Sequence, residues 1–276
     1  MKSPSVIVAR RSALFALGLG LLITSLPGQQ APRLSVLTYN IHIGTGMDKK
    51  LDLARTAAVI KSAAPDLVAL QEVDRRTRRT GGVDQAIELA RLTGMYPIFG
   101  KALDLEGIDQ NGGDYGNAIL SRFPIRRSQN RALPNTPKFE PRAVLEIEID
   151  WPHPNGARIP LRFFATHFDV GSEPDRIASA KALNELAGLD PDVPAILAGD
   201  LNSVPASEPL KLLAKQWAVA SGADEIATSP ANAPRRQIDY ILFRPARAWR
   251  VIDIKALDEA VASDHRPVLA VLEYAH

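Results

Sequence analysis

Residues 194–202 read Pro-Ala-Ile-Leu-Ala-Gly-Asp-Leu-Asn. A short apolar run followed at once by Gly, Asp and Asn is typical of a buried strand that ends in a polar loop. Ligand sites in α/β architectures gather where strands end, because the loops converge there. Three other apolar runs end in the same way: Leu34–Tyr39 before Asn40, Leu67–Leu70 before Glu72, and Phe163–Thr166 before His167.

Outward from this stretch, strand-like and helix-like segments alternate along the chain. Asp52 is a plausible N-cap for a helix over Leu53–Ala63, which Pro65 would end. Further helices are predicted at Asp84–Leu92, Glu173–Leu186 and Glu208–Lys215, and further strands at Asn117–Leu120, Ala143–Ile149, Gln237–Phe243, Trp249–Ile254 and Pro267–Tyr274. No linker-like composition divides the chain, so the pattern predicts one domain of mixed sheets covered by helices.

Composition restricts the chemistry of any site. Of the 276 residues, 46% are hydrophobic, which is ordinary for a globular domain with a substantial core. The formal net charge of +2 does not indicate a nucleic-acid binder, although a local basic patch would suffice to attract phosphate. The chain has no cysteine, which excludes disulfides and thiolate metal sites. A metal site must therefore use oxygen ligands, with or without histidine.

The N-terminus differs from the rest of the chain. Basic residues precede an apolar run at 13–26, and Pro27 and Gly28 then break the run. This order is the signal-peptide pattern, and the run is short for a membrane span of about 20 residues. We therefore expect residues 1–31 to be an export signal and residues 32–276 to be the domain, located in the periplasm or secreted. Retention of residues 13–26 as a membrane anchor is the alternative.

Seven short motifs carry a resemblance to a known family. In chain order they are Thr38-Tyr39-Asn40-Ile41-His42, Gln71-Glu72-Val73-Asp74, Gly116-Asn117-Ala118-Ile119-Leu120-Ser121-Arg122, Thr166-His167-Phe168-Asp169, Gly199-Asp200-Leu201-Asn202, Ile238-Asp239-Tyr240 and Ser263-Asp264-His265-Arg266-Pro267. Each motif alone is weak, but the ordered set resembles the endonuclease/exonuclease/phosphatase superfamily, the group of DNase I and exonuclease III. The resemblance implies an α+β fold, a four-layer α/β/β/α sandwich of two packed mixed sheets flanked by helices.

The resemblance also implies a division of labour among the motif residues. Asn40, Glu72 and Asp264 would hold Mg²⁺ or Mn²⁺, since hard cations prefer oxygen ligands. Five residues would carry the chemistry: Asp200 on the attacking water, Asn202 and His167 on the phosphate, His265 on the phosphate or a proton, and Asp239 as the partner of His265. This set predicts metal-assisted attack of water on phosphorus.

Other residues have a weaker claim to the site. Asn117 is expected to support the site from behind, and His42 would share the face of Asn40 only if that strand continued. Asp74 is interpreted as a solubilising loop residue. The run Arg75-Arg76-Thr77-Arg78-Arg79 reads equally well as a solvated loop or as a guanidinium cluster that binds additional phosphates, with Arg75 and Arg142 as candidates.

The leading hypothesis is therefore a divalent-metal-dependent phosphodiesterase, a nuclease that acts on DNA or RNA as a monomer, with no protein partner implied. A second hypothesis keeps the chemistry but changes the substrate to a lipid headgroup diester, as in sphingomyelinases, or to an inositol or sugar phosphate. A third is a non-catalytic binding module of the same fold. The complete set of catalytic residue types argues against the third, and fold alone does not choose between the first two.

Overall fold

The computed structural model describes Met1 and residues 31–105 and 112–274. The predicted export signal, residues 1–31, lies outside the described part apart from its two end residues. Among the described residues, no helix is both long and apolar enough to cross a membrane.

Within the described residues, twelve strands form two six-stranded sheets. The first has the order β11 (Trp249–Ala256), β12 (Val268–Tyr274), β1 (Arg33–Asn40), β2 (Leu67–Arg75), β4 (Asp114–Ser121), β3 (Tyr96–Asp104). The second has the order β5 (Ile125–Ala132), β6 (Ala143–Pro152), β7 (Arg158–His167), β8 (Ala195–Asp200), β10 (Asp239–Arg244), β9 (Ala218–Val219). Each sheet is mixed, with one parallel pair at its centre, β1–β2 in the first and β7–β8 in the second.

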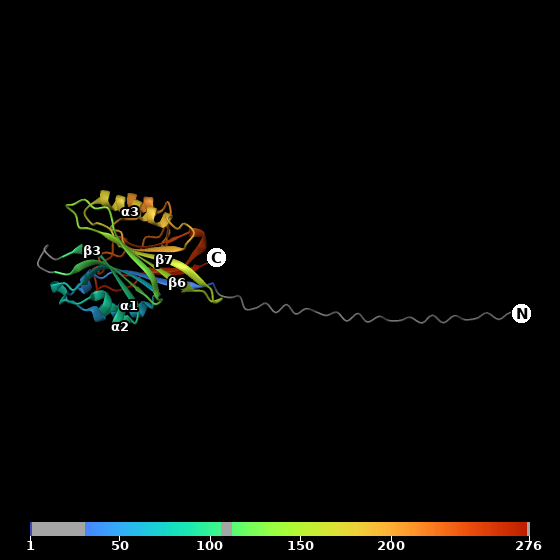
Figure 1. The fold of residues 1–276 in the computed structure, drawn as a ribbon, viewed down its shortest axis with the longest axis horizontal. Coiled ribbons are helices and arrows are strands. Elements are labelled where there is room, and N and C mark those ends of the chain that lie inside the picture. Colours follow the sequence, from blue (N-terminus) through green and yellow to red (C-terminus); the bar gives the residue numbers. More distant parts are fainter. Residues whose placement is uncertain (2–30, 106–111, 275–276) are drawn as a thin grey trace. The chain divides into compact units, whose positions relative to one another are not determined.

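Helices cover the outer face of each sheet (Figure 1). Against the first sheet pack α1 (Leu53–Ala63) and α2 (Gln85–Thr93), and against the second α3 (Glu173–Gly188) and α4 (Glu208–Leu213). Short 3₁₀ turns occur at η1 (His42–Gly44), η2 (Arg78–Thr80) and η3 (Ala246–Ala248). The predicted four-layer sandwich is confirmed.

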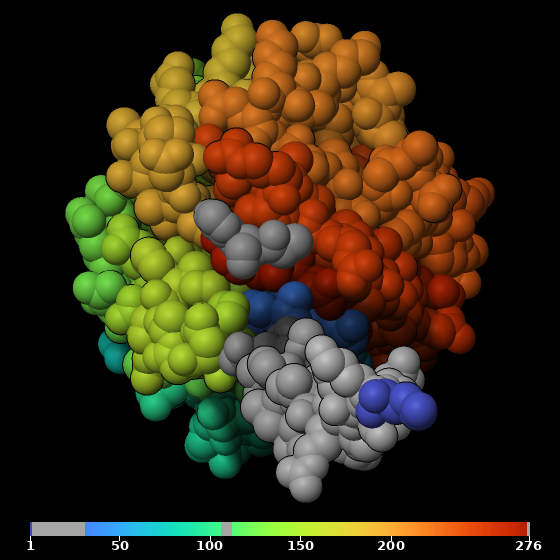
Figure 2. Space-filling model, turned by 90° about the vertical axis from the view of Figure 1, so that its right-hand side faces the viewer, coloured from blue at the N-terminus to red at the C-terminus, as the bar shows by residue number. Residues whose placement is uncertain are grey.

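One apolar cluster lies between each sheet and its helices. Another fills the space between the two sheets and is closed at one end by aromatic rings. Trp151 stacks on Trp249 with ring centroids 5.8 Å apart, and Tyr274 meets Trp249 edge-on at 4.9 Å. Figure 2 faces this end, where yellow-green atoms of the β6–β7 hairpin lie beside red atoms of the C-terminal strands. Since Trp151 pairs with Ile159 at the start of β7, the aromatic cluster lies away from the strand ends that carry the motif residues.

The local predictions succeed where apolar spacing is regular. The first helix has the predicted bounds, and the Asp52 side chain caps it by accepting a hydrogen bond from the Arg55 amide at 2.9 Å. The edge strand β5 was missed because its side chains are mostly exposed and polar. Its arginines pair across to acids, as Arg126 does with Asp150, and such charges protect an exposed sheet edge.

Candidate active site

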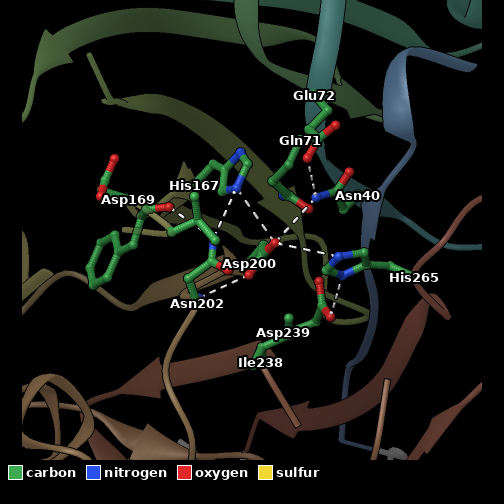
Figure 3. Close-up of polar contacts among 12 residues, drawn as sticks. Asn40, Gln71, Glu72, His167, Asp169, Asp200, Asn202, Ile238, Asp239 and His265 are labelled. Carbon is green, nitrogen blue, oxygen red and sulfur yellow. Dashed lines mark hydrogen bonds and ion pairs between the residues drawn. The ribbon is translucent and has the colours of Figure 1, made fainter. Parts of the chain in front are cut away.

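Strand register brings the motif residues of both sheets to one end of the sandwich. Asn40 lies beside Gln71 in the parallel β1–β2 pair, and His167 lies beside Asp200 in the parallel β7–β8 pair. Asp239 begins β10 directly opposite Asp200. The predicted convergence of strand ends is therefore what the structure shows, and the side chains of Asn40, His167 and His265 point toward Asp200 (Figure 3).

Asp200 is the centre of the polar cluster and is 1% exposed. Its Oδ1 accepts a hydrogen bond from the backbone amide of Asn202 at 2.9 Å, and its Oδ2 accepts one from Asn40 Nδ2 at 3.2 Å. The Nε2 atoms of His167 and His265 lie 3.5 and 3.8 Å from the same Oδ2. Burial, followed by the charge of Asp239, raises the pKa of Asp200 to about 7.

Asp239 and His265 form a buried acid–imidazole pair. His265 Nδ1 lies 2.9 Å from Asp239 Oδ2, which also accepts a hydrogen bond from the Thr228 hydroxyl at 2.5 Å. Burial alone would lower the pKa of His265, but the charges of Asp239 and Asp200 outweigh it and raise the pKa to about 10. The predicted partnership of these two residues is thus present, with the imidazole held protonated and its Nε2 facing Asp200.

The predicted metal ligands lie beside this pair. Asn40 Nδ2 donates to Glu72 Oε1 at 3.0 Å, and the side-chain Oδ1 of Asn40 accepts a hydrogen bond from the His42 backbone amide at 3.1 Å. Asp264 is more open, with 42% of its side chain exposed and Oδ1 3.9 Å from His42 Nδ1. Two carboxylates and an amide that can turn its oxygen inward are a donor set suited to a hard divalent cation.

A second group of possible ligands, Asp200, Asp239 and His265, is buried, and its ligand atoms lie within 4.8 Å of one another. Here the His265 Nδ1 and Asp239 Oδ2 atoms are already bonded to each other. This trio can therefore serve either as ligands or as a proton-handling pair with Asp200, while Asn40, Glu72 and Asp264 are the metal ligands predicted from the sequence.

Three of the seven described non-glycine residues with positive φ are site residues. Glu72 has φ 56°, Asn202 φ 45° and His42 φ 48°, the left-handed region that non-glycine residues rarely adopt. Such conformations cost about 1–3 kcal/mol each and persist where the surroundings enforce them. Glu72 sits at a register shift of β2 against β4 between Leu70 and Val73, which turns its carboxylate into the site.

This bulge also corrects two predictions. Glu72 does not follow the strand, because β2 continues past it to Arg75. Asp74 is not a solubilising residue: its side chain is buried and bonded to Thr77 and Arg79. A bulge breaks the apolar period, and so the second half of the strand was not recognised.

The arginine run is partly engaged within the domain. Arg75 pairs with Asp114 and stacks over Phe99 at 4.7 Å, and Arg79 pairs with Asp74 at 2.6 Å. Arg76 and Arg78 are exposed. In this run Arg75 and Arg79 pair with acidic side chains of the domain, and Arg76, Arg78 and Arg79 are exposed at the surface.

Three further residues predicted from the sequence lie around the site: Asn117, His42 and Arg142. Asn117 is buried in β4 and donates to the Ala143 carbonyl of the other sheet at 2.9 Å, which fits the expected supporting role. The strand does not continue to His42, whose ring Nδ1 contacts the Thr45 carbonyl at 3.1 Å at the rim. Arg142 is 7% exposed and contacts His167 rather than solvent.

A pocket of about 190 Å³ adjoins the site at Glu72. Its lining combines apolar, aromatic and charged side chains: His42, Ile43, Glu72, Arg79, Leu103, Leu105, Tyr115 and Glu140. Sequence reasoning missed the roles of Glu140 and Thr228. No spacing signal marks them, because each reaches the site through tertiary packing alone.

A family model described as the Endonuclease/Exonuclease/phosphatase family matches residues 37–265. The chain is 28% identical over 257 residues to the uncharacterized protein YbhP of Escherichia coli (strain K12), with 85% of this chain and 94% of that protein covered. It superimposes on the endonuclease/exonuclease/phosphatase from Beutenbergia cavernae DSM 12333 with a TM-score of 0.69 and 26% identity, covering 88% of this chain and 72% of that one. A mannosyl-6-phosphatase from Bacteroides thetaiotaomicron shares the fold at TM-score 0.70 and 21% identity, covering 87% and 100%.

The chain belongs to the endonuclease/exonuclease/phosphatase family. Members of this family are hydrolases that act on phosphoesters and are typically metal-dependent. The predicted family membership is confirmed.

The Asp239–His265 pair predicts how stability depends on pH in the metal-free protein. A histidine whose folded-state pKa of about 10 exceeds its unfolded value of about 6.5 stabilises the fold fully below pH 6.5, and this stabilisation is lost as pH rises toward 10. Urea unfolding in EDTA should show the wild type losing about 1 kcal/mol per pH unit more than His265→Gln between pH 7 and 9.5. Parallel slopes for the two proteins would contradict the assigned pairing.

Proposed function

We propose that this protein is a divalent-metal-dependent phosphodiesterase that cleaves nucleic acid. The observation that carries the proposal is the convergence on Asp200 of two histidines and two amides from both sheets. This arrangement offers, within one polar cluster, a base, hydrogen-bond donors for phosphoryl oxygens and a protonated imidazole. Phosphoester hydrolysis needs each of these parts.

In this proposal Asp200 orients and deprotonates the attacking water. A general base works best when its pKa is close to the operating pH, and burial raises the pKa of Asp200 to about 7. Asn202 donates from its amide to a phosphoryl oxygen. His265, kept protonated by Asp239, places a positive charge and a proton on the phosphate side of the site.

Asn40, Glu72 and Asp264 would hold the cation, for which Mg²⁺ or Mn²⁺ suits the oxygen donors. A bound divalent cation supplies neutralisation of charge on the phosphoryl oxygens and lowers the pKa of coordinated water. The Ser263 hydroxyl donates to the Asn40 carbonyl at 2.7 Å, so the segments that carry two of these ligands are tied together.

Two exposed arginines favour a polyanionic diester. Arg76 and Arg78 are exposed directly after the strand that carries Glu72. Guanidinium groups bind phosphates in bidentate geometry, so these two side chains suit the neighbouring phosphates of a nucleic-acid strand. We also propose that the enzyme is exported and acts as a monomer, on the basis of the N-terminal pattern and of a site built from one chain.

The pocket beside Glu72 favours a second candidate. Its volume of about 190 Å³ and its mixture of Glu140, Arg79 and Tyr115 suit one small polar group, such as a sugar or a lipid headgroup. This candidate uses the same catalytic residues and differs only in substrate.

A substrate panel tests the proposal. Purified protein in Mg²⁺ would be assayed on plasmid DNA, RNA, sphingomyelin, inositol and sugar phosphates, and chromogenic mono- and diesters. We expect cleavage of DNA or RNA at rates at least about tenfold above any monoester, since the exposed arginines bind only a substrate with several phosphates. An Arg76→Ala, Arg78→Ala double variant should lose this preference while retaining chromogenic diester activity. Preference for sphingomyelin or a sugar phosphate would support the second candidate instead.

A further inference from the structure

Arg142 lies against the side of His167 that faces away from Asp200. Arg142 lies directly before β6, in the loop that carries Glu140, and its side chain is 7% exposed. Its Nη1 atom lies 2.8 Å from Glu140 Oε1 and 3.0 Å from His167 Nδ1. The guanidinium is thus held by its ion pair with Glu140 while it contacts the histidine.

The hydrogen bond between Arg142 and His167 can have only one direction. A guanidinium has donors and no acceptor, so it can satisfy His167 Nδ1 only by donating to that atom. Nδ1 must then carry a lone pair, and in a neutral imidazole the proton must be on Nε2. Burial, followed by the positive charge of Arg142, lowers the pKa of His167, which keeps the ring neutral.

The position of the proton determines which hydrogen bonds Nε2 can make with its neighbours. Asp200 Oδ2, an acceptor, lies 3.5 Å away, and Asn202 Nδ2, a donor, lies 3.1 Å away. Both ring nitrogens cannot accept at once, so Arg142 and Asn202 compete to set the tautomer. Charge-assisted hydrogen bonds are about twice as strong as neutral ones, and the Asn202 amide also donates to the Phe168 carbonyl at 3.0 Å. Arg142 therefore prevails.

We infer that Arg142 is a positioning residue, which fixes His167 in the Nε2–H tautomer so that this ring donates a hydrogen bond into the site instead of accepting a proton there. The donor role toward a phosphoryl oxygen rests on the proposed function. The tautomer itself does not, because it follows from the contacts on the other side of the ring. Arg142 thus contacts His167, whereas the sequence predicted that it would bind a substrate phosphate directly.

The tautomer can be measured without substrate. The chain has five histidines, so long-range ¹H–¹⁵N correlation spectra of labelled protein are simple to assign with a His167→Gln variant. Wild type should show a pyrrole-like Nε2 and a pyridine-like Nδ1 for His167. Arg142→Met, which keeps the bulk but removes the donors, should shift this pattern toward the Nδ1–H form, with Asn202 donating to Nε2. Arg142→Lys, which keeps a cationic donor, should recover much of the wild-type pattern.

Turnover provides the second measurement. Arg142→Met should lower kcat on a chromogenic diester by about tenfold or more with a smaller change in KM, because removing one donor to a developing oxyanion costs about 10²–10³ in kcat. Arg131→Met, which removes an arginine paired with Glu146 away from the site, is the matched control and should match wild type. An Nδ1–H tautomer in the wild type, or an unchanged tautomer in Arg142→Met, would overturn the inference. The predicted spectra in a protein that cleaves no phosphoester would sustain it and refute the proposed function.

Discussion

Asp200→Asn is expected to lower turnover of a phosphodiester by at least about a thousandfold while the protein remains folded. General-base catalysis contributes about 10²–10⁴ in rate, and an amide cannot accept the proton of the attacking water. The substitution also removes the charge that keeps His265 protonated together with Asp239. Both losses fall on the chemical step, so kcat should fall much more than KM rises.

The folded state of this variant can be checked independently. Asp200 is a buried carboxylate whose pKa is raised, mainly by burial, so its charged form is destabilising above about pH 7. A neutral amide of the same shape should therefore leave urea stability at pH 8 unchanged or higher. Asp190→Asn, at a side chain 57% exposed beyond α3, is the matched control and should keep full activity. Near-normal turnover in Asp200→Asn would refute the role assigned to this carboxylate.

Much of the fold could be predicted because it depends on local signals. The cap at Asp52, the apolar period of α1 and the buried run at Ala195–Asp200 are each specified by a few neighbouring residues. The strand β5 could not be recognised, because an exposed edge strand keeps neither an apolar face nor a regular alternation. The same holds for the end of β2, where the left-handed Glu72 interrupts the pattern.

The candidate site divides in the same way. Asp200, Asn202 and His167 stand at strand ends and could be chosen from the sequence, and register explains why they meet. Their supporting residues could not be chosen, since Thr228 reaches Asp239 across 11 residues and Arg142 reaches His167 across 25. Asp74 illustrates the opposite error: beside four arginines it resembled a surface residue, but it is buried as the counter-ion of Arg79.

Removal of the divalent cation by EDTA is expected to have the second large effect on the rate of hydrolysis. Glu72 and Asp264 leave the site with two carboxylates beside an amide, and no described lysine or arginine is paired with either in place of a cation. Without a cation, these charges would repel the phosphate of the substrate. EDTA should therefore abolish hydrolysis, and Glu72→Gln should require a higher Mg²⁺ concentration than wild type to reach half of its maximal rate.

The most direct measurement is the rate of plasmid DNA cleavage by the wild-type protein, first in EDTA and then after excess Mg²⁺ or Mn²⁺ is added. The structure predicts a rate in EDTA indistinguishable from that of Asp200→Asn, and recovery of the full rate when the cation is restored. Cleavage that continues undiminished in EDTA would contradict a metal-dependent site at Asn40, Glu72 and Asp264.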